Sequence, residues 1–457
     1  MQQFSNCYFF DFLTVSKFVI TGGQPLVGAV RLGGAKNASF KIMIASLLLK
    51  GRSRLLNLAK IGDVELTRQI IESLGAKTIP CGERTIFIDP NGLSSWKIPA
   101  QFGDVSRSAL LFIPPLIKHF GKAQIPFPGG DKIGQRPIER HLEGFTALGG
   151  QYQFQKNKIF LFAPRGLTGA HYRFAKNTHT GTENLIMLAV IANGKTVLEN
   201  AALETEIDDL IYFLNSAGAK ITRLANRKIR IIGTPDKMFG RTHAIMPDAN
   251  EAASYACAAL ITKGDIAIEG AKRKDLSILL EKIDQAGGGF KVYSWGIRFW
   301  WKGDLKATRI VTKPFPGFKT DWQPLWTSLA TQMVGTSQIV ETIYEDRFSF
   351  VEPLKKMGAK IEFFQPKVTN PEKFYNFNYQ EADPKLYHGI KVTGPTPLRG
   401  SHFAAVDLRH GATLTIAALA AQGTSQIDNA QVIDRGYEDL GPKIKELGGK
   451  IKIVNND

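Results

Sequence analysis

The stretch KIMIASLLLKGRSRLLNLAKIGDVELTRQIIESLGA, residues 41–76, is one copy of a unit that recurs along the whole chain. An apolar segment ends at Gly51, a strand pattern follows, and an amphipathic segment ends at Gly75. Ile42 to Leu49 is apolar almost throughout, which predicts a helix buried on all sides. The second segment is predicted to be an amphipathic helix, because apolar residues recur at helical spacing on one face: Leu66, Ile70, Ile71 and Leu74.

The same pair of glycines appears six times along the chain. Neighbouring first glycines are 70 to 88 residues apart. Glycine readily adopts the left-handed backbone conformation in which many helices end, so each is expected to mark a helix stop. A period this regular indicates an α/β fold of six βα units rather than one doubly wound sheet. The first set is Gly51, Gly121, Gly194, Gly264, Gly335 and Gly423, and the second is Gly75, Gly149, Gly218, Gly287, Gly358 and Gly448.

The chain length indicates two domains. At 457 residues the chain exceeds what one ordinary hydrophobic core supports. Six units divide evenly into three per domain, and the fourth unit begins near residues 246–250. The longest interval, between Gly335 and Gly423, contains an insertion at residues 365–387 that is rich in Asn, Lys, Pro and aromatic residues. We expect this insertion to be an elaborated surface loop.

The composition is that of a soluble globular protein, with 44% hydrophobic and 22% charged residues. The longest apolar stretch, Ala109 to Ile117, contains two prolines and is too short to cross a bilayer, so no membrane association is expected. Residues 1–16 lack a basic start and a cleavage site, and we interpret them as a loose extension rather than a signal peptide. Three scattered cysteines argue against disulfides and a zinc site and fit a reducing cytoplasm: Cys7, Cys81 and Cys257.

The net charge of +17 favours anionic partners. Nucleic acid is one class of partner, but the basic residues are dispersed and no aromatic motif for stacking bases accompanies them. A field that gathers small phosphorylated substrates explains the same charge. We therefore expect no nucleic-acid partner, and neither a metal nor a cofactor is expected.

Two glycine-rich segments place cations where an anion could bind. Gly33 and Gly34 precede Lys36 and Asn37 at a helix start, which offers backbone N–H groups, a positive dipole end and an ammonium together. Such a turn is also a common helix entry. Residues 128–137 contain three glycines, which imply mobility. The guanidinium group of Arg136 can bind a carboxylate or a phosphate through two hydrogen bonds. Taken alone, Asp131 in this loop would be a solvated turn residue.

Acidic and basic side chains also mark the starts of later helices. Asp321 precedes an apolar helix and is either its N-cap or a functional carboxylate. Asp407 and Arg409, and likewise Asp434 and Arg435, are either structural ion pairs or parts of an anion site. Four cations lie at equivalent ends of the repeats, where this fold can gather them: Lys36, Arg136, Arg409 and Arg435.

In their order, these motifs resemble the UDP-N-acetylglucosamine enolpyruvyl transferase family. The resemblance runs from about Lys17 to the C-terminus. It implies an inside-out α/β barrel of two domains with three repeats each. The domains it implies are an extension 1–16, a first domain 36–247 with a mobile loop 126–137, and a second domain 17–35 plus 248–457. The motifs are Gly34-Ala35-Lys36-Asn37, residues 128–137, Thr320-Asp321-Trp322-Gln323, Asp407-Leu408-Arg409 and Asp434-Arg435-Gly436-Tyr437-Glu438.

The family reaction gives the matching residues expected roles. The 3′-hydroxyl of UDP-N-acetylglucosamine adds to C2 of phosphoenolpyruvate, C3 gains a proton, and loss of phosphate leaves an enolpyruvyl ether. Asp321 is expected to take the hydroxyl proton, with Lys36 and Asp131 as further catalytic residues. The phosphoenolpyruvate ligands implied are Lys36, Asn37, Arg136, Arg409 and Arg435. The UDP-N-acetylglucosamine ligands implied are Arg107, Arg136, Pro137, Ile138, Glu139, Arg140, Lys176, Thr178, His179, Asp321 and Ile343.

Asp131 departs from the family pattern, because most members carry at this position the cysteine that the epoxide fosfomycin attacks. An aspartate can also donate the proton that C3 needs. An ordinary Asp, with a pKa of about 3.9, is only about one-thousandth protonated at pH 7, so desolvation must favour its acid form. The resemblance therefore implies fosfomycin resistance. Two further departures are Leu203 and Ala249, where the family has arginine.

Three alternatives to this function remain. The same fold serves enolpyruvylshikimate-phosphate synthases, but their Gly-Ser-Lys-Ser type of motif is replaced here by Gly34-Ala35-Lys36-Asn37. A non-catalytic paralogue would bind sugar nucleotides and regulate cell-wall synthesis. An RNA 3′-phosphate cyclase would need a histidine nucleophile, for which only His402 and His410 are near a motif. We expect the enzyme of peptidoglycan synthesis, acting in cell wall biogenesis, cell shape, cell division and the cell cycle, as a monomer or weak homo-oligomer.

Overall fold

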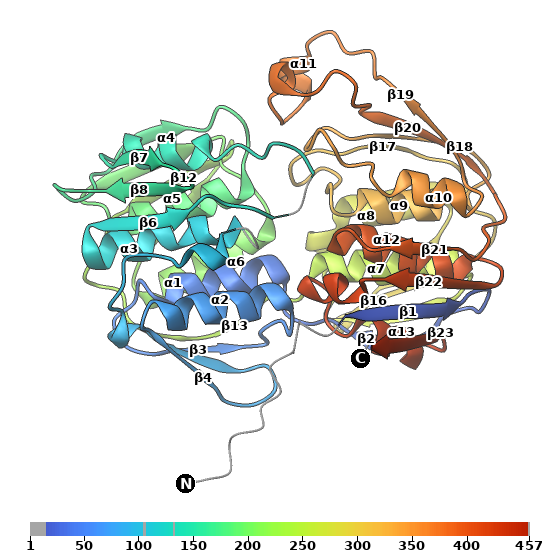
Figure 1. Ribbon diagram of the computed structural model, residues 1–457, viewed down its shortest axis with the longest axis horizontal. Helices are drawn as coiled ribbons and strands as arrows, with labels where there is room; N and C mark the ends of the chain where they lie inside the picture. Colours follow the sequence, from blue (N-terminus) through green and yellow to red (C-terminus); the bar gives the residue numbers. More distant parts are fainter. Residues whose placement is uncertain (1–14, 104–106, 131–132, 456–457) are drawn as a thin grey trace. The chain divides into compact units, whose positions relative to one another are not determined.

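The computed structural model describes residues 15–103, 107–130 and 133–455. The described chain divides into two compact units. The first unit contains the residues from Gly34 to Met246, apart from 133–136. The second unit contains the N-terminal strands, residues 133–136 and everything from Pro247 onward. Each unit contains three small β-sheets on its outside and apolar helices in its interior (Figure 1).

Short strands and helices alternate along the chain of the first unit. Its helices are α1 Lys36–Ser46, α2 Gly62–Ser73, α3 Ile113–Phe120, α4 Glu139–Ala147, α5 His179–Ile191 and α6 Thr205–Ala217, with short 3₁₀ segments η1 Pro90–Gly92, η2 Ala100–Phe102 and η3 Arg107–Phe112. Its strands are β3 Ser53–Leu56, β4 Lys77–Pro80, β5 Ile86–Asp89, β6 Lys122–Pro126, β7 Gln151–Gln155, β8 Lys158–Phe162, β9 His171–Arg173, β10 Lys195–Glu199, β11 Lys220–Leu224, β12 Lys228–Ile232 and β13 Thr242–Ala244.

The second unit is also built from short strands and helices, and it includes both N-terminal strands. Its helices are α7 Ala249–Ile261, α8 Arg273–Ala286, α9 Gln323–Ala330, α10 Val351–Lys356, α11 Pro371–Phe374, α12 Leu408–Ala420 and α13 Leu440–Glu446, with η4 Tyr379–Glu381 and η5 Ala430–Arg435. Its strands are β1 Ser16–Thr21, β2 Val27–Arg31, β14 Asp265–Glu269, β15 Gly289–Val292, β16 Gly296–Trp300, β17 Arg309–Val311, β18 Gly335–Val340, β19 Lys360–Phe364, β20 Gly389–Gly394, β21 His402–Ala404, β22 Thr424–Asp428 and β23 Lys450–Asn455.

Each repeat contributes one sheet, which confirms the predicted six-unit α/β architecture. In the order β11-β12-β10-β9, for example, β9 runs parallel to β10 and the other pairs are antiparallel. The sheet β6-β8-β7 has three strands, and a parallel bridge between Lys97 and Gln124 stands where the others have their parallel strand. The strands β1 and β2 complete two sheets of the second unit, β21-β22-β1-β23 and β15-β16-β14-β2.

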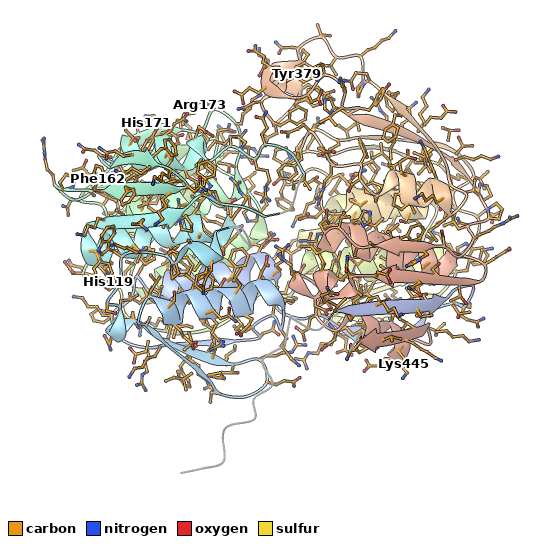
Figure 2. The ribbon with its side chains drawn as sticks, viewed as in Figure 1. His119, Phe162, His171, Arg173, Tyr379 and Lys445 are labelled. Atoms are coloured by element: carbon orange, nitrogen blue, oxygen red, sulfur yellow. The ribbon has the colours of Figure 1, made fainter. Side chains whose placement is uncertain are left out.

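The interior helices are those predicted to be apolar all round. In the first unit, α1 is buried from Ala38 to Ser46, and α5 from Gly181 to Ile191. In the second unit, α7, α9 and α12 pack against one another. The amphipathic helix α2 buries Ile70 and Ile71 completely. Polar side chains such as His171, Arg173 and Lys445 lie at the periphery of their units (Figure 2). A layer of helices enclosed by sheets is the inside-out arrangement that the sequence predicts.

The glycine prediction holds at eleven of the twelve positions, where φ is positive, and is wrong at Gly264. There Lys263 adopts the left-handed conformation, with φ 56°. A Cβ on Gly264 would overlap the backbone of Leu26, so glycine is needed for a close approach between backbones rather than for its φ.

The chain passes between the units at Gly33–Gly34 and at Met246–Pro247. In the first unit Ala35 N–H donates to the Met246 carbonyl at 2.7 Å, and in the second unit Asp248 N–H donates to the Gly33 carbonyl at 3.0 Å. The Gly33 amide donates to buried Glu251, which also pairs with Lys443. Burial raises the pKa of Glu251 to about 7 despite that lysine.

Candidate active site

Lys36 is the first residue of α1 and is buried against a carboxylate that the sequence analysis did not single out. Its Nζ donates to Asp63 Oδ2 at 2.5 Å, and both residues are less than a tenth exposed. Asp63 lies in the first turn of α2. An ammonium has three donors, so Lys36 can bind Asp63 and a ligand anion together. Asn37, next in the chain, is half-buried.

A second buried cluster of charged groups, which we call the Lys41–Glu183–His179 cluster, joins α1 to the start of α5. The fully buried Glu183 contacts Lys41 Nζ, and its Oε1 is 3.2 Å from His179 Nε2. Lys41 Nζ lies 3.2 Å from the same ring nitrogen. Burial opposes the imidazolium most strongly, but Glu183 and Glu204 outweigh burial and Lys41 and raise the pKa of His179. The His179 side chain is still 23% exposed, so this cluster reaches the surface of the first unit.

Two stretches predicted to bind the nucleotide lie side by side in the first unit. Arg140, in the first turn of α4, donates to the Asn177 carbonyl at 3.2 Å. Lys176 and Asn177 lead into Thr178, which caps α5 by accepting from the Gly181 amide at 3.2 Å. The remaining residues of the first stretch range from buried to exposed: Ile138 is buried, Pro137 half-buried and Glu139 exposed.

Arg107, at the start of η3, belongs to the same neighbourhood. Burial first, and then the positive charges of Arg107, Arg140 and Lys41, lower the pKa of His141 to about 3. His141 is therefore neutral and its Nδ1 is 3.0 Å from Asn184 Nδ2. Three cations around one neutral imidazole make this face of the first unit attractive to an anion.

In the second unit, Asp321 forms ion pairs with two arginines. Its Oδ1 lies 3.0 Å from Arg347 Nη2 and 3.3 Å from Arg409 Nε. Both arginine side chains are almost completely buried, whereas the Asp321 side chain is 30% exposed. The alternative that Asp321 caps the helix is wrong, because the N-cap of α9 is Trp322. An exposed carboxylate fixed by two buried cations can accept a proton from a ligand.

Arg409 is fixed from several directions. Its Nη1 donates to the Tyr437 hydroxyl at 2.8 Å, and Ser254 donates to the same hydroxyl at 3.1 Å. Asp407 does not pair with Arg409 through its guanidinium but caps α12 by accepting from the amides of Arg409 and His410. Arg435 ends η5 two residues before Tyr437 and is half-buried.

The segment after β18 brings further predicted residues together. The Ile343 amide donates to Glu341 at 2.7 Å, so this N–H is engaged inside the protein. Glu341 is buried, which raises its pKa, and it also accepts from Thr320, the neighbour of Asp321, at 3.0 Å. Arg136 has φ 50°, and its guanidinium lies 5.9 Å from the Tyr344 ring centroid. Arg136 thus lies beside the segment that contains Ile343.

Asp131, the predicted proton donor, lies outside the described residues. Among the residues that are described, no group of three His, Cys, Asp or Glu side chains gathers where a metal could bind. Within the same residues, the helices are too short or too polar to cross a membrane.

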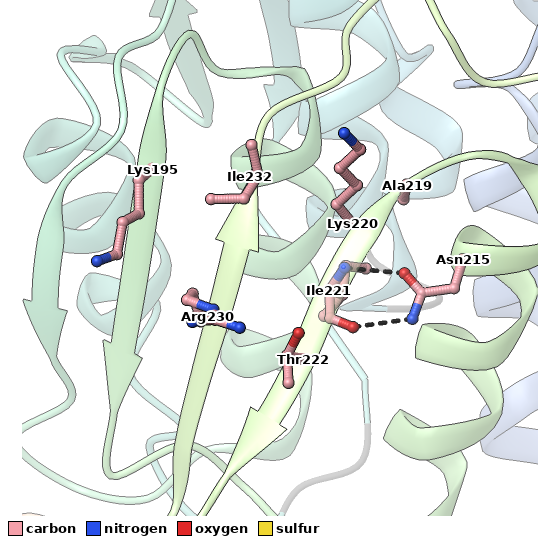
Figure 3. A pocket seen from close by; sticks show the side chains of 8 residues that line it. All are labelled: Lys195, Asn215, Ala219, Lys220, Ile221, Thr222, Arg230 and Ile232. Atoms are coloured by element: carbon pink, nitrogen blue, oxygen red, sulfur yellow. Dashed lines mark hydrogen bonds between the residues drawn. The ribbon is translucent and has the colours of Figure 1, made fainter.

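A hollow on the surface of the first unit is not part of the candidate active site. It lies over β10, β12 and β11, and Lys195, Lys220 and Arg230 line it (Figure 3). The cationic ends of Lys195 and Lys220 point away from each other, and Asn215 is occupied by hydrogen bonds to both backbone groups of Ile221. None of the predicted ligands lines this hollow.

Comparison with known proteins agrees with the fold and with the family that the sequence resembles. The EPSP synthase (3-phosphoshikimate 1-carboxyvinyltransferase) family model matches residues 20–444. The enolpyruvyl transferase NikO from Streptomyces tendae has the same fold, with a TM-score of 0.84, 21% identity, and coverage of 97% of this chain and 100% of that one. EPSP synthase from Acinetobacter baumannii superposes with a TM-score of 0.69 at 17% identity, covering 96% of this chain and all of its own. The family match and the fold therefore define the class of protein, which is that of the carboxyvinyl (enolpyruvyl) transferases.

More similar relatives narrow the class. The UDP-N-acetylglucosamine 1-carboxyvinyltransferase of Chlamydia muridarum is 38% identical over 439 residues, 94% of this chain and 97% of its own. That of Trichlorobacter lovleyi is 36% identical over 441 residues, 96% of this chain and all of its own. This chain belongs to the UDP-N-acetylglucosamine 1-carboxyvinyltransferase family.

Proposed function

We propose that this protein transfers the enolpyruvyl group of phosphoenolpyruvate to the 3′-hydroxyl of UDP-N-acetylglucosamine and releases inorganic phosphate. The observation that carries the proposal is the position of Asp321, partly exposed and bound by Arg347 and Arg409. A base must be ionised and must reach the hydroxyl proton, and this carboxylate meets the first requirement through its two ion pairs. The names of the relatives at 36% and 38% identity support the same reaction.

In the proposed reaction every atom is accounted for. The hydroxyl proton goes to Asp321 while the 3′-oxygen bonds to C2 of phosphoenolpyruvate, and C3 receives a proton, for which we propose Asp131 as donor. C3 then returns a proton to the ionised Asp131, the bond from C2 to the phosphate oxygen breaks, and the phosphate leaves with the proton that Asp321 took from the hydroxyl. The products are one enolpyruvyl ether and one phosphate ion.

Each substrate has its own set of binding residues in this proposal. The anionic phosphoenolpyruvate is bound by cations and by the start of α1, and the residues we assign to it are Lys36, Asn37, Arg136, Arg409 and Arg435. A phosphate-bearing substrate needs such groups to offset its charge during bond breaking. The residues we assign to the nucleotide are Arg107, Arg136, Pro137, Ile138, Glu139, Arg140, Lys176, Thr178, His179, Asp321 and Ile343.

The reaction proposed is the entry into peptidoglycan precursor synthesis, which would place the protein in the cytoplasm with a role in cell wall biogenesis, cell shape and cell division. Phosphate release from phosphoenolpyruvate, measured with and without UDP-N-acetylglucosamine, tests the proposal. We expect release only with both substrates present. Release that depends on shikimate 3-phosphate instead of the sugar nucleotide would replace this function with that of an enolpyruvylshikimate-phosphate synthase.

A further inference from the structure

The connection between β19 and β20, residues 365–388, is far longer than the corresponding hairpin turns, which are residues 81–85, 156–157, 225–227 and 293–295. It contains α11 and η4 and extends beyond the sheet that bears it (Figure 1). Four of its rings form what we call the aromatic cluster: Tyr375, Phe377, Tyr379 and His388.

The aromatic cluster is a small core of its own. Tyr375 stacks on Tyr379 with a centroid distance of 5.0 Å and an interplanar angle of 5°, and Phe377 lies 5.0 Å from the His388 ring. Tyr375, Phe377 and His388 are between 2% and 4% exposed. Figure 2 labels Tyr379 at the outer end of this connection. A loop that only decorated the surface would leave such side chains in water, so the connection has a fixed structure.

This core is attached to the segment that follows β18. The Asn376 amide donates to the Thr342 carbonyl at 2.7 Å, and the Glu341 amide donates to the His388 carbonyl at 2.9 Å. The His388 ring lies beside the backbone of Glu345. Two hydrogen bonds therefore tie residues 341 and 342 to the connection.

The same segment holds residues 133–136. The Gln135 amide donates to Glu345 Oε1 at 2.6 Å, and the Asp346 amide donates to the Ile133 carbonyl at 3.2 Å. The Gln135 side chain reaches the connection itself, donating to the Glu381 carbonyl at 2.9 Å. Gly134 has φ 136°, and a Cβ there would overlap the Glu345 carboxyl group, so this approach requires glycine.

We propose that the 365–388 connection is a positioning element for Arg136, acting through Glu345. The connection holds residues 341 and 342. Glu345, in the same segment, accepts from the Gln135 amide, and Arg136 follows in the chain beside Tyr344. The inference rests on the proposed function, in which Arg136 binds both substrates. Glu345 and the aromatic cluster touch no substrate in this account and act only through the backbone of residues 133–136.

Hydrogen exchange tests the positioning without any substrate. In Phe377→Ala, which opens the aromatic cluster, the amides of residues 133–136 should lose protection relative to the unmodified protein. Tyr387→Ala is the matched control, because Tyr387 belongs to the same connection but is 51% exposed and stacks on Phe363 instead. In Tyr387→Ala, the amides of residues 133–136 should keep their protection from hydrogen exchange. Phe377→Leu keeps apolar volume and serves if the alanine variant does not fold.

Kinetics then tests whether the positioning matters. A displacement of about 1 Å at a substrate ligand can cost about 10²-fold, so Phe377→Ala should lose about that factor in kcat/KM for phosphoenolpyruvate while Tyr387→Ala does not. Unchanged protection at 133–136 in folded Phe377→Ala overturns the proposal, and so does lost protection with unchanged kcat/KM. Lost protection in a protein whose unmodified form shows no turnover supports the docking on Glu345 and refutes the proposed function instead.

Discussion

Asp321 and Arg347 form an ion pair in which the arginine is buried and the aspartate is partly exposed, with Nη2 3.0 Å from Oδ1. Arg409 approaches the same oxygen at 3.3 Å. The pair fixes the carboxylate without removing it from solvent, which a residue needs if it is to meet a substrate. A helix cap would instead turn its carboxylate toward the amides of its own helix.

Asp321→Asn should lower kcat by about 10²–10⁴-fold, the usual contribution of a positioned base, while substrate binding persists. The fold should be retained, because asparagine keeps an oxygen that can accept hydrogen bonds from Arg347 and Arg409. No helix cap is lost either, since Trp322 is the N-cap of α9. Steady-state kinetics and a thermal melt check both statements. Asp265→Asn is the matched control, since it breaks an exposed Asp–Arg pair with Arg298 elsewhere in the second unit. Near-normal turnover in Asp321→Asn would remove the base from the mechanism.

Lys36→Ala should destabilise the protein as well as weaken phosphoenolpyruvate binding, because it leaves the buried Asp63 carboxylate without its lysine. Removing one partner of a buried pair typically costs about 3–5 kcal/mol. Urea unfolding measures the loss of stability, and the KM for phosphoenolpyruvate measures the weakening of binding. In Lys36→Met/Asp63→Leu the stability should return, since both charges are gone, but activity should not. Recovery of activity in the double variant would mean that Lys36 has only a structural role.

The Lys41–Glu183–His179 cluster makes a pH-dependent contribution to stability. The pKa of His179 is raised in the folded protein, so its stabilising charge is fully present below about pH 6.5 and is lost as the pH rises through the folded pKa. The groups that act on it are Glu183, Lys41 and Glu204.

The free energy of unfolding should therefore differ more between the unmodified protein and His179→Gln at pH 6 than at pH 9. Glu183→Gln should lower the pKa of His179, measured by NMR titration of its ring protons. His141 is the internal control, because burial and its cationic neighbours lower its pKa to about 3 and it should not titrate over this range. An unshifted His179 in Glu183→Gln would contradict the assignment.

Asp131→Cys should keep activity and become sensitive to fosfomycin. A thiolate is a strong nucleophile toward an epoxide and a carboxylate is a weak one, so the unmodified protein should not accumulate an adduct. Intact-mass analysis after incubation with the drug checks both proteins. An adduct mapped to Asp131 in the unmodified protein would contradict the predicted resistance.

The repeat could be predicted from sequence because each copy contains its own helix stop and its own apolar periodicity. Gly264 shows the limit of that reasoning, since its role comes from the backbone of Leu26, more than two hundred residues away in the chain. The apolar helix that starts at Lys36 could also be predicted from local sequence, because its burial follows from composition alone.

The ion pairs of the site could not be predicted in the same way. Asp63 and Arg347 are ordinary helix-start and loop residues in sequence, and only the packing of α1 on α2 and of residues 341–347 beside α9 reveals their partners. The insertion at 365–387 was predicted as a surface loop from its composition. Its aromatic residues did not reveal that Tyr375 and Phe377 are buried, because both rings also pack against His388, which lies beyond the insertion.

The most direct test of the central claim is the mass of the nucleotide after reaction with phosphoenolpyruvate labelled with ¹³C at C2. We predict that UDP-N-acetylglucosamine gains one labelled enolpyruvyl group and that one phosphate is released per nucleotide converted. Asp321→Asn should do neither at a comparable rate. A folded protein that binds both substrates but leaves the nucleotide mass unchanged would contradict it.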